Sequence, residues 1–221
     1  MSIAENIQKI RRDIPDGVTL VVVSKYHPQQ ALMEAYECGE RVFGESRVQE
    51  MAQKYQELPK DIEWHMIGHL QTNKVKYIAP FVALIHSVDS LELLMQIDKQ
   101  GAKHGRVIDC LLQLHVAAEE SKFGLVLGQA ARLLISKEFA VLRNVRIRGV
   151  MGMGTHTDDM ERVKADFDAI KGEFDALKSE FFADADYFDT VSMGMSGDFQ
   201  LAINEGSTMV RIGTTIFGER E

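Results

Sequence analysis

The sequence is poor in cysteine: among 221 residues only Cys38 and Cys110 carry a thiol, and they lie far apart. Two distant cysteines provide neither a disulfide framework nor the paired spacing of a zinc site, so no metal is expected. Residues 1–13 are charged and amphipathic, which differs from the apolar core of a secretory signal. We therefore expect a cytoplasmic protein.

Long apolar runs and basic clusters are also missing. No stretch approaches the length of a membrane-spanning helix, so no membrane partner is expected. The 25 Lys and Arg residues are outnumbered by 33 Asp and Glu, for a formal net charge of −8. Nucleic acids are bound by clustered basic residues, so an extended nucleic-acid surface is excluded. Because no Pro/Gly/Ser-rich linker divides the chain, residues 1–221 are predicted to form a single domain.

What is present is an alternation of strand-like and helical patterns. Eight runs resemble buried strands, at residues 18–24, 41–45, 62–68, 82–87, 107–116, 146–151, 188–192 and 209–212. Helical patterns between them include residues 28–39, 89–104, 127–138, 158–182 and 196–204. Eight strands that are each followed by a helix or a terminus predict an α/β fold, a closed (β/α)₈ TIM barrel. An open, doubly wound sheet is the structural alternative.

Lys25 directly follows the first apolar run, Val18–Ser24. In parallel α/β proteins, active-site groups lie at the carboxyl ends of the strands. Partial burial there lowers the pKa of a lysine toward the reactive free amine, which is the form that makes a Schiff base. The alternative is a lysine that extends from a strand end into water.

Two segments rich in Gly, Ser and Thr follow the last two predicted strands, at residues 192–198 and 211–215. In barrels, these two loops commonly bind phosphate through backbone N–H groups and small hydroxyl side chains. Ordinary turns and helix caps are the alternative role for such residues. The candidate phosphate contacts are Ser192, Ser196, Gly213, Thr214 and Thr215.

Closing the barrel makes the first and eighth strands neighbours, which places Lys25 beside Arg211 and the phosphate segments. An aldehyde-reactive lysine, a phosphate site and a cation between them are the parts that hold pyridoxal 5′-phosphate (PLP). Side chains in the third strand alternate between its two faces, and His65 is expected on the face toward the barrel interior. Met151 or Met153 can pack on a flat ring, although a core methionine is the commoner role.

The sequence resembles the YggS family, the pyridoxal phosphate homeostasis proteins. The resembling motifs occur in order along nearly the whole chain: Val23-Ser24-Lys25, Phe43-Gly44-Glu45, Trp64-His65 with Gly68, Leu70-Gln71-Thr72-Asn73-Lys74, Lys122-Phe123-Gly124, Ser192-Met193-Gly194-Met195-Ser196 and Arg211-Ile212-Gly213-Thr214. The resemblance implies a barrel of the alanine-racemase N-terminal type with Lys25 as the internal aldimine lysine. It also implies Ser196, Gly213 and Thr214 at the phosphate and Arg211 at the pyridine nitrogen.

Beside Ser192, four further residues are candidate cofactor contacts: Met193, Gly194, His65 and Met151. Many relatives have Asn-Tyr in place of Ser46-Arg47 and Pro in place of His69, so no contact is assigned to these positions.

The function expected from the resemblance is a part in vitamin B6 and amino-acid homeostasis. In the related racemases, the second catalytic base is a tyrosine from an added β domain across a dimer. Because this sequence ends at Glu221, just past the eighth strand, we expect no such domain and a monomer. A cation beside the ring nitrogen disfavours its protonation and so weakens the cofactor as an electron sink.

We therefore predict a carrier or buffer of PLP without robust catalysis, with apo forms of PLP-dependent enzymes as candidate partners. One alternative is a PLP-dependent amino-acid racemase of low activity. Another is an aldolase-type barrel whose lysine forms a Schiff base with a sugar phosphate.

Overall fold

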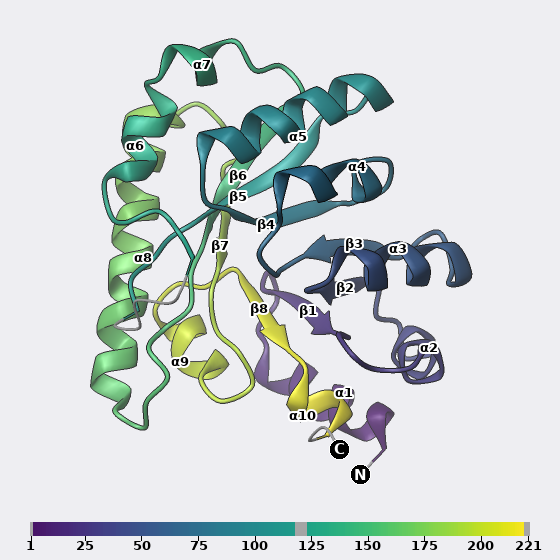
Figure 1. The fold of residues 1–221 in the computed structure, drawn as a ribbon. Helices are drawn as coiled ribbons and strands as arrows, with labels where there is room; N and C mark the ends of the chain where they lie inside the picture. The colour runs from purple at the N-terminus through teal and green to yellow at the C-terminus, as the bar shows by residue number, and fades with distance from the viewer. Residues whose placement is uncertain (1, 118–122, 219–221) are drawn as a thin grey trace.

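The computed structural model describes residues 2–117 and 123–218, and its eight parallel strands close into a barrel in the order β1 to β8 (Figure 1). The strands are β1 (Thr19–Val23), β2 (Val42–Glu45), β3 (Glu63–Met66), β4 (Leu84–Val88), β5 (Ile108–Gln113), β6 (Val145–Met151), β7 (Thr190–Ser192) and β8 (Met209–Ile212). The predicted barrel is confirmed, and the open-sheet alternative is wrong.

Helices surround the barrel. They are α1 (Ile3–Asp13), α2 (Gln29–Glu37), α3 (Val48–Glu57), η1 (Thr72–Lys74), α4 (Val75–Ile78), α5 (Leu91–His104), α6 (Gln129–Leu134), α7 (Lys137–Ala140), α8 (Met160–Phe181), α9 (Phe199–Asn204) and α10 (Thr214–Phe217). Figure 1 shows α1 and α10 at the same edge of the molecule as both termini. Asn6 Nδ2 of α1 donates to the carbonyl of Ile216 in α10 at 2.9 Å, which joins the first and last helices. Within the described residues, no helix is long and apolar enough to cross a membrane.

The bounds of several elements differ from the sequence prediction, and for three of them the hydrogen bonds or helix bounds show where the difference arises. The helix predicted at 127–138 is two helices, because Ser136 donates its hydroxyl to the carbonyl of Leu133 and caps the amide of Phe139. The helix predicted from Ser196 begins only at Phe199. The seventh strand begins at Thr190, since the amide of Phe188 is in a turn with the carbonyl of Ala185.

Side chains alternate between the two faces of each strand, as the pleat requires. One set, which includes Val22, Phe43 and Trp64, is buried beneath the helices in the main hydrophobic core. The other set points into the barrel, where five buried residues form a separate apolar cluster: Val21, Leu84, Leu111, Met151 and Met209. This cluster fills the barrel, so it is a packed core rather than a pore.

Candidate functional site

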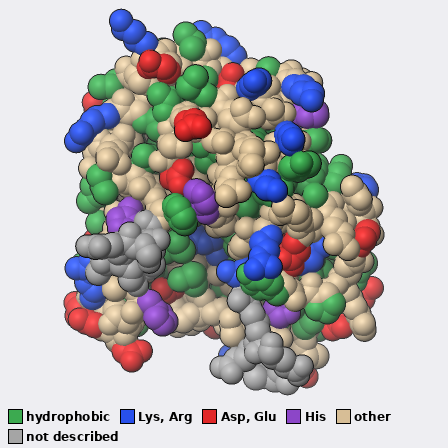
Figure 2. Space-filling model, in the orientation of Figure 1, with side chains coloured by type: hydrophobic (Ala, Val, Ile, Leu, Met, Phe, Trp, Pro, Cys, Tyr) green, Lys and Arg blue, Asp and Glu red, His purple; other side chains and the backbone are tan. Residues whose placement is uncertain are grey.

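A cavity of about 620 Å³ lies at the carboxyl ends of the barrel strands. Most of its wall comes from the ends of β1 and β8 and from the segments after β1, β6, β7 and β8: Val23, Lys25, residues 153–158, residues 195–198, Arg211, Gly213 and Thr214. The face drawn in Figure 2 is hollowed near its middle, with basic side chains deep in the hollow and histidines around it. A concave site at this end of a barrel is where ligands bind in this architecture.

The five principal residues predicted from the sequence all line this one cavity: Lys25, Ser196, Arg211, Gly213 and Thr214. Their convergence depends on the pairing of β1 with β8, in which Val21 lies opposite Arg211 and Val22 opposite Ile212. Lys25 is half-buried in the turn that follows β1. The predicted neighbourhood of Lys25 and Arg211 is therefore confirmed, although their role toward a ligand stays a prediction.

Arg211 is held rigidly in the cavity wall. Its Nη1 donates to the carbonyl and the hydroxyl of Ser192 at 2.8 and 2.7 Å, and its Nη2 donates to the carbonyl of Gly152 at 3.0 Å. Burial lowers the pKa of Arg211 to about 10, against a smaller opposing effect of Asp198. The guanidinium therefore remains a fixed cation at neutral pH.

Ser192 links Arg211 to two histidines inside the barrel. His86 Nδ1 lies 3.1 Å from the Ser192 hydroxyl, and His86 Nε2 lies 3.0 Å from His65 Nδ1. Because arginine only donates, the Ser192 hydroxyl accepts from Arg211 and its own hydrogen goes to His86 Nδ1. This assignment places the His86 hydrogen on Nε2, from which it is donated to His65. The predicted interior position of His65 is confirmed.

Both histidines are neutral in the folded protein. Burial lowers the pKa of His65 to about 3 and that of His86 well below its ordinary value, with the nearby His65 and Arg211 adding to the effect on His86. In the unfolded chain a histidine titrates near a pKa of about 6.5. Below that pH the unfolded state binds protons that the folded state excludes.

Stability is therefore expected to fall as the pH decreases from about 6.5 toward 3, by about 1.4 kcal/mol per pH unit for each histidine. Urea unfolding at pH 7, 6 and 5 measures this slope. In a His65→Gln variant, the stability lost per pH unit below pH 6 should be smaller by about the contribution of one histidine. An unchanged slope in that variant would show that His65 is not held neutral.

The segments after β7 and β8 bring small residues to the cavity. Gly213 precedes α10, and a Cβ at this position would lie 2.9 Å from the carbonyl oxygen of Val23, so only glycine fits between β8 and β1. The Ser196 hydroxyl accepts from the amide of Thr215 at 3.4 Å. Peptide N–H groups and hydroxyls beside two basic side chains form a donor set that suits an anion such as phosphate.

The additional candidates lie behind the cavity wall. Ser192 and His65 belong to the hydrogen-bonded chain under Arg211. Met151 is in the barrel interior, Met193 is in the outer core, and the carbonyl of Gly194 accepts from the amide of Arg211 at 3.0 Å. None of these five candidates is among the described residues that line the cavity.

Sequence reasoning missed much of the loop after β6. Met153 to Asp158 line the cavity, and the loop is fixed because both the amide and the hydroxyl of Thr155 donate to buried Asp166, at 2.7 and 2.6 Å. Gly149, Gly152 and Gly154 permit close approach of the backbone to a ligand, but nothing in the sequence pattern indicates Asp166 as the residue that anchors the loop.

Of the three residues that depart from the family pattern, Ser46, Arg47 and His69, one lines the cavity and the other two contact aromatic rings. Ser46 lines the cavity, whereas the His69 ring stacks on Phe123 with the centroids 3.9 Å apart. Arg47 covers the ring of Tyr26. Lys122, part of one resembling motif, lies outside the described residues.

Comparison with known proteins gives one consistent picture. The profile described as "Alanine racemase, N-terminal domain" matches residues 1–221. The pyridoxal phosphate homeostasis protein of Aquifex aeolicus is 40% identical over 224 residues, which cover 99% of this chain and 96% of that protein. That of Escherichia coli is 35% identical over 99% of this chain and 97% of its own length.

Solved structures agree. PipY of Synechococcus elongatus, solved without PLP, superposes with a TM-score of 0.91 at 35% identity, covering 98% of this chain and 100% of PipY. PipY with PLP bound gives a TM-score of 0.87 over the same coverage. An alanine racemase of Clostridium difficile shares the fold, with a TM-score of 0.76 at 13% identity over 57% of its length. The chain is thus a member of the YggS family, the pyridoxal phosphate homeostasis proteins, and its barrel is of the alanine-racemase N-terminal type.

Proposed function

We propose that this protein binds PLP covalently and reversibly at Lys25 and takes part in intracellular PLP homeostasis as a buffer or carrier. The observation that carries the proposal is the convergence of Lys25, Arg211 and the Ser196, Gly213 and Thr214 segments on one cavity. A solved structure of PipY, 35% identical over 98% of this chain, has PLP bound. In this proposal the protein acts as a cytoplasmic monomer whose partners are apo forms of PLP-dependent enzymes.

The residues present fit PLP. The cavity volume is within the range of small-molecule sites, and Gly213 keeps the backbone clear where a side chain would meet Val23. Ser196, Gly213 and Thr214 would hold the phosphate through hydroxyl and N–H donors. The Lys25 amine would add to the aldehyde carbon, with the aldehyde oxygen leaving as water, and Arg211 would lie at the ring nitrogen.

The same residues favour binding over turnover. When bound, PLP supplies an electron sink, which is strong only if its ring nitrogen is protonated. Arg211 stays charged and is fixed by three hydrogen bonds, so it disfavours a second proton nearby. Tyr26, the tyrosine nearest Lys25 in sequence, is half-exposed with its ring under Arg47, and so is not directed as a base into the cavity.

The first experiment is an absorbance titration of the cofactor-free protein with PLP. We expect a visible Schiff-base band that saturates at one PLP per chain and disappears when an apo PLP-dependent enzyme is added, as that enzyme becomes active. Circular dichroism of L-alanine incubated with the loaded protein should show no racemisation. Racemisation that depends on Lys25 would contradict the carrier role and favour the racemase alternative.

A further inference from the structure

A buried ion-pair cluster lies between β2 and α3, next to the turn that contains Lys25. Glu45 Oε1 accepts from Lys54 Nζ at 2.8 Å and from the Ser24 hydroxyl at 2.6 Å. Lys54 Nζ also donates to the carbonyl of Ser24 at 2.9 Å and to Glu50 Oε1 at 2.7 Å. Glu45 and Lys54 are 0% and 5% exposed. All three N–H groups of the ammonium therefore have acceptors.

These bonds hold the main chain on both sides of Lys25. The Ser24 carbonyl that accepts from Lys54 belongs to the peptide bond preceding Lys25. The amide of Tyr26, which belongs to the following peptide bond, donates to Glu50 Oε1 at 2.6 Å. One network thus fixes both peptide groups that flank the lysine.

The turn needs such support because it is strained. Tyr26 has a φ of 67°, the left-handed region, and is the one non-glycine residue with positive φ among those the structure describes. This conformation is unfavourable for a bulky side chain and persists only where the surroundings impose it. Arg47 adds a contact, with its guanidinium carbon 4.7 Å from the Tyr26 ring centroid.

Stability alone does not account for the cluster. The desolvation of two buried charges offsets most of their attraction, so apolar residues of similar size stabilise a core at least as well. Glu45 Oε2 is buried without a hydrogen-bond partner within the described part of the chain, which adds a further cost. What the charges provide, and apolar side chains cannot, is hydrogen bonding to the Lys25 main chain.

We infer that Glu45, Lys54 and Glu50 are positioning residues for Lys25. They hold the main chain of Lys25, so that its side chain enters the cavity from one fixed point. The amine is thereby presented to the aldehyde of a PLP molecule whose phosphate is bound by the segments after β7 and β8. This inference rests on the proposed function, since it concerns the same lysine.

The test separates covalent attachment from binding. A Glu45→Leu, Lys54→Met double variant removes both buried charges together. We expect its rate constant for Schiff-base formation with PLP, followed by stopped-flow absorbance, to fall roughly tenfold to hundredfold. Pyridoxine 5′-phosphate carries the phosphate but an alcohol in place of the aldehyde, and its dissociation constant should change less than about twofold.

A second variant measures the turn without cofactor. Glu50→Ala removes the acceptor of the Tyr26 amide, and we expect hydrogen exchange at that amide to accelerate roughly tenfold in the cofactor-free protein. The matched control is Arg11→Met with Glu40→Leu, an ion pair whose buried carboxylate lies before the start of β2, whereas Glu45 is the last residue of β2. This control should leave the attachment rate and the Tyr26 exchange unchanged.

The outcomes are distinct. A double variant that attaches PLP at the wild-type rate, or an unchanged exchange rate in Glu50→Ala, overturns the positioning role. Equal losses of PLP attachment and pyridoxine 5′-phosphate affinity also overturn it, because they indicate general damage to the cavity. A wild-type protein that forms no Schiff base overturns the proposed function instead.

Discussion

Replacing Gly149 by alanine is expected to destabilise the fold by more than about 4 kcal/mol. Gly149 in β6 lies opposite Thr190 in β7 and has a φ of 151°. A Cβ built there would be 1.8 Å from the carbonyl oxygen of Thr190 and 2.7 Å from its carbonyl carbon. Both atoms belong to the backbone, so no rotamer change relieves the overlap.

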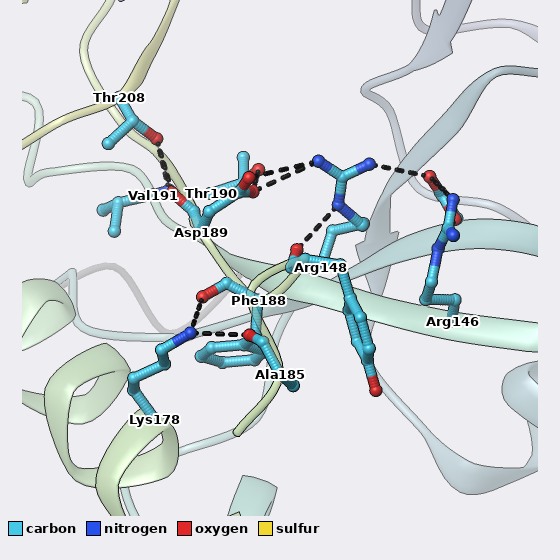
Figure 3. Close-up of polar contacts among 11 residues, drawn as sticks. Arg146, Arg148, Lys178, Ala185, Phe188, Asp189, Thr190, Val191 and Thr208 are labelled. Atoms are coloured by element: carbon cyan, nitrogen blue, oxygen red, sulfur yellow. Dashed lines mark hydrogen bonds and ion pairs between the residues drawn. The ribbon is translucent and has the colours of Figure 1, made fainter. Parts of the chain in front are cut away.

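The β7 segment cannot move aside, because it is bonded to both neighbouring strands (Figure 3). Arg148 donates from Nη2 to both carboxylate oxygens of Asp189, at 3.2 and 3.3 Å. On the other side, the amide of Val191 donates to the Thr208 hydroxyl at 2.9 Å. Accommodating a methyl group would therefore disrupt the pairing of β6 with β7 that places Gly152 and Ser192 around Arg211.

Urea unfolding followed by far-ultraviolet circular dichroism measures this effect. The matched control is Gly172→Ala in α8, where an added Cβ has no neighbour within 4 Å. That variant should be more stable than wild type by about 0.5–1 kcal/mol, because alanine favours a helix interior. A Gly149→Ala protein as stable as wild type would show that β6 and β7 are not this closely apposed.

The second large effect is expected for Lys25→Ala. Without the amine, no Schiff base can form, so the absorbance band of the PLP complex should be lost completely. Pyridoxine 5′-phosphate should still bind, since Ser196, Gly213 and Thr214 are unchanged. Because Lys25 is half-buried in a turn rather than in the core, the midpoint of thermal unfolding should change little.

Lys74→Ala is the matched control for the loss of a lysine. Lys74 follows the third strand in η1, and its ammonium lies 5.8 Å from the centroid of the Tyr77 ring, outside the cavity wall. Its PLP band should equal that of the wild type. A normal band in Lys25→Ala, or its loss in Lys74→Ala, would require another lysine as the point of attachment.

Much of the fold could be predicted from the sequence because strand and helix periodicity are local. The eighth strand occurs at residues 209–212, as predicted, and closing the barrel placed Arg211 next to the turn that carries Lys25. The errors concern where elements begin, end or divide, which a single capping group can decide. Ser136 is one such group, since its side chain separates α6 from α7.

The cluster of Glu45 and Lys54 could not be predicted in the same way. Its members come from the residue after β1, from the end of β2 and from α3, and no spacing in the sequence relates Lys54 to the carbonyl of Ser24. A lysine within a helical pattern is ordinarily a solvated residue. Its burial follows only from how α3 packs on the barrel, and the same is true of Asp166 beneath the loop after β6.

We propose that one lysine, Lys25, holds PLP. The most direct measurement is reduction of the PLP-loaded wild-type protein with borohydride, which converts a Schiff base into a stable secondary amine, followed by mass spectrometry of its peptides. We predict one phosphopyridoxyl group per chain, on the peptide that contains Lys25. A phosphopyridoxyl group found on another lysine in the same amount as on Lys25 would contradict the assignment of Lys25. The absence of any modified peptide would contradict it as well.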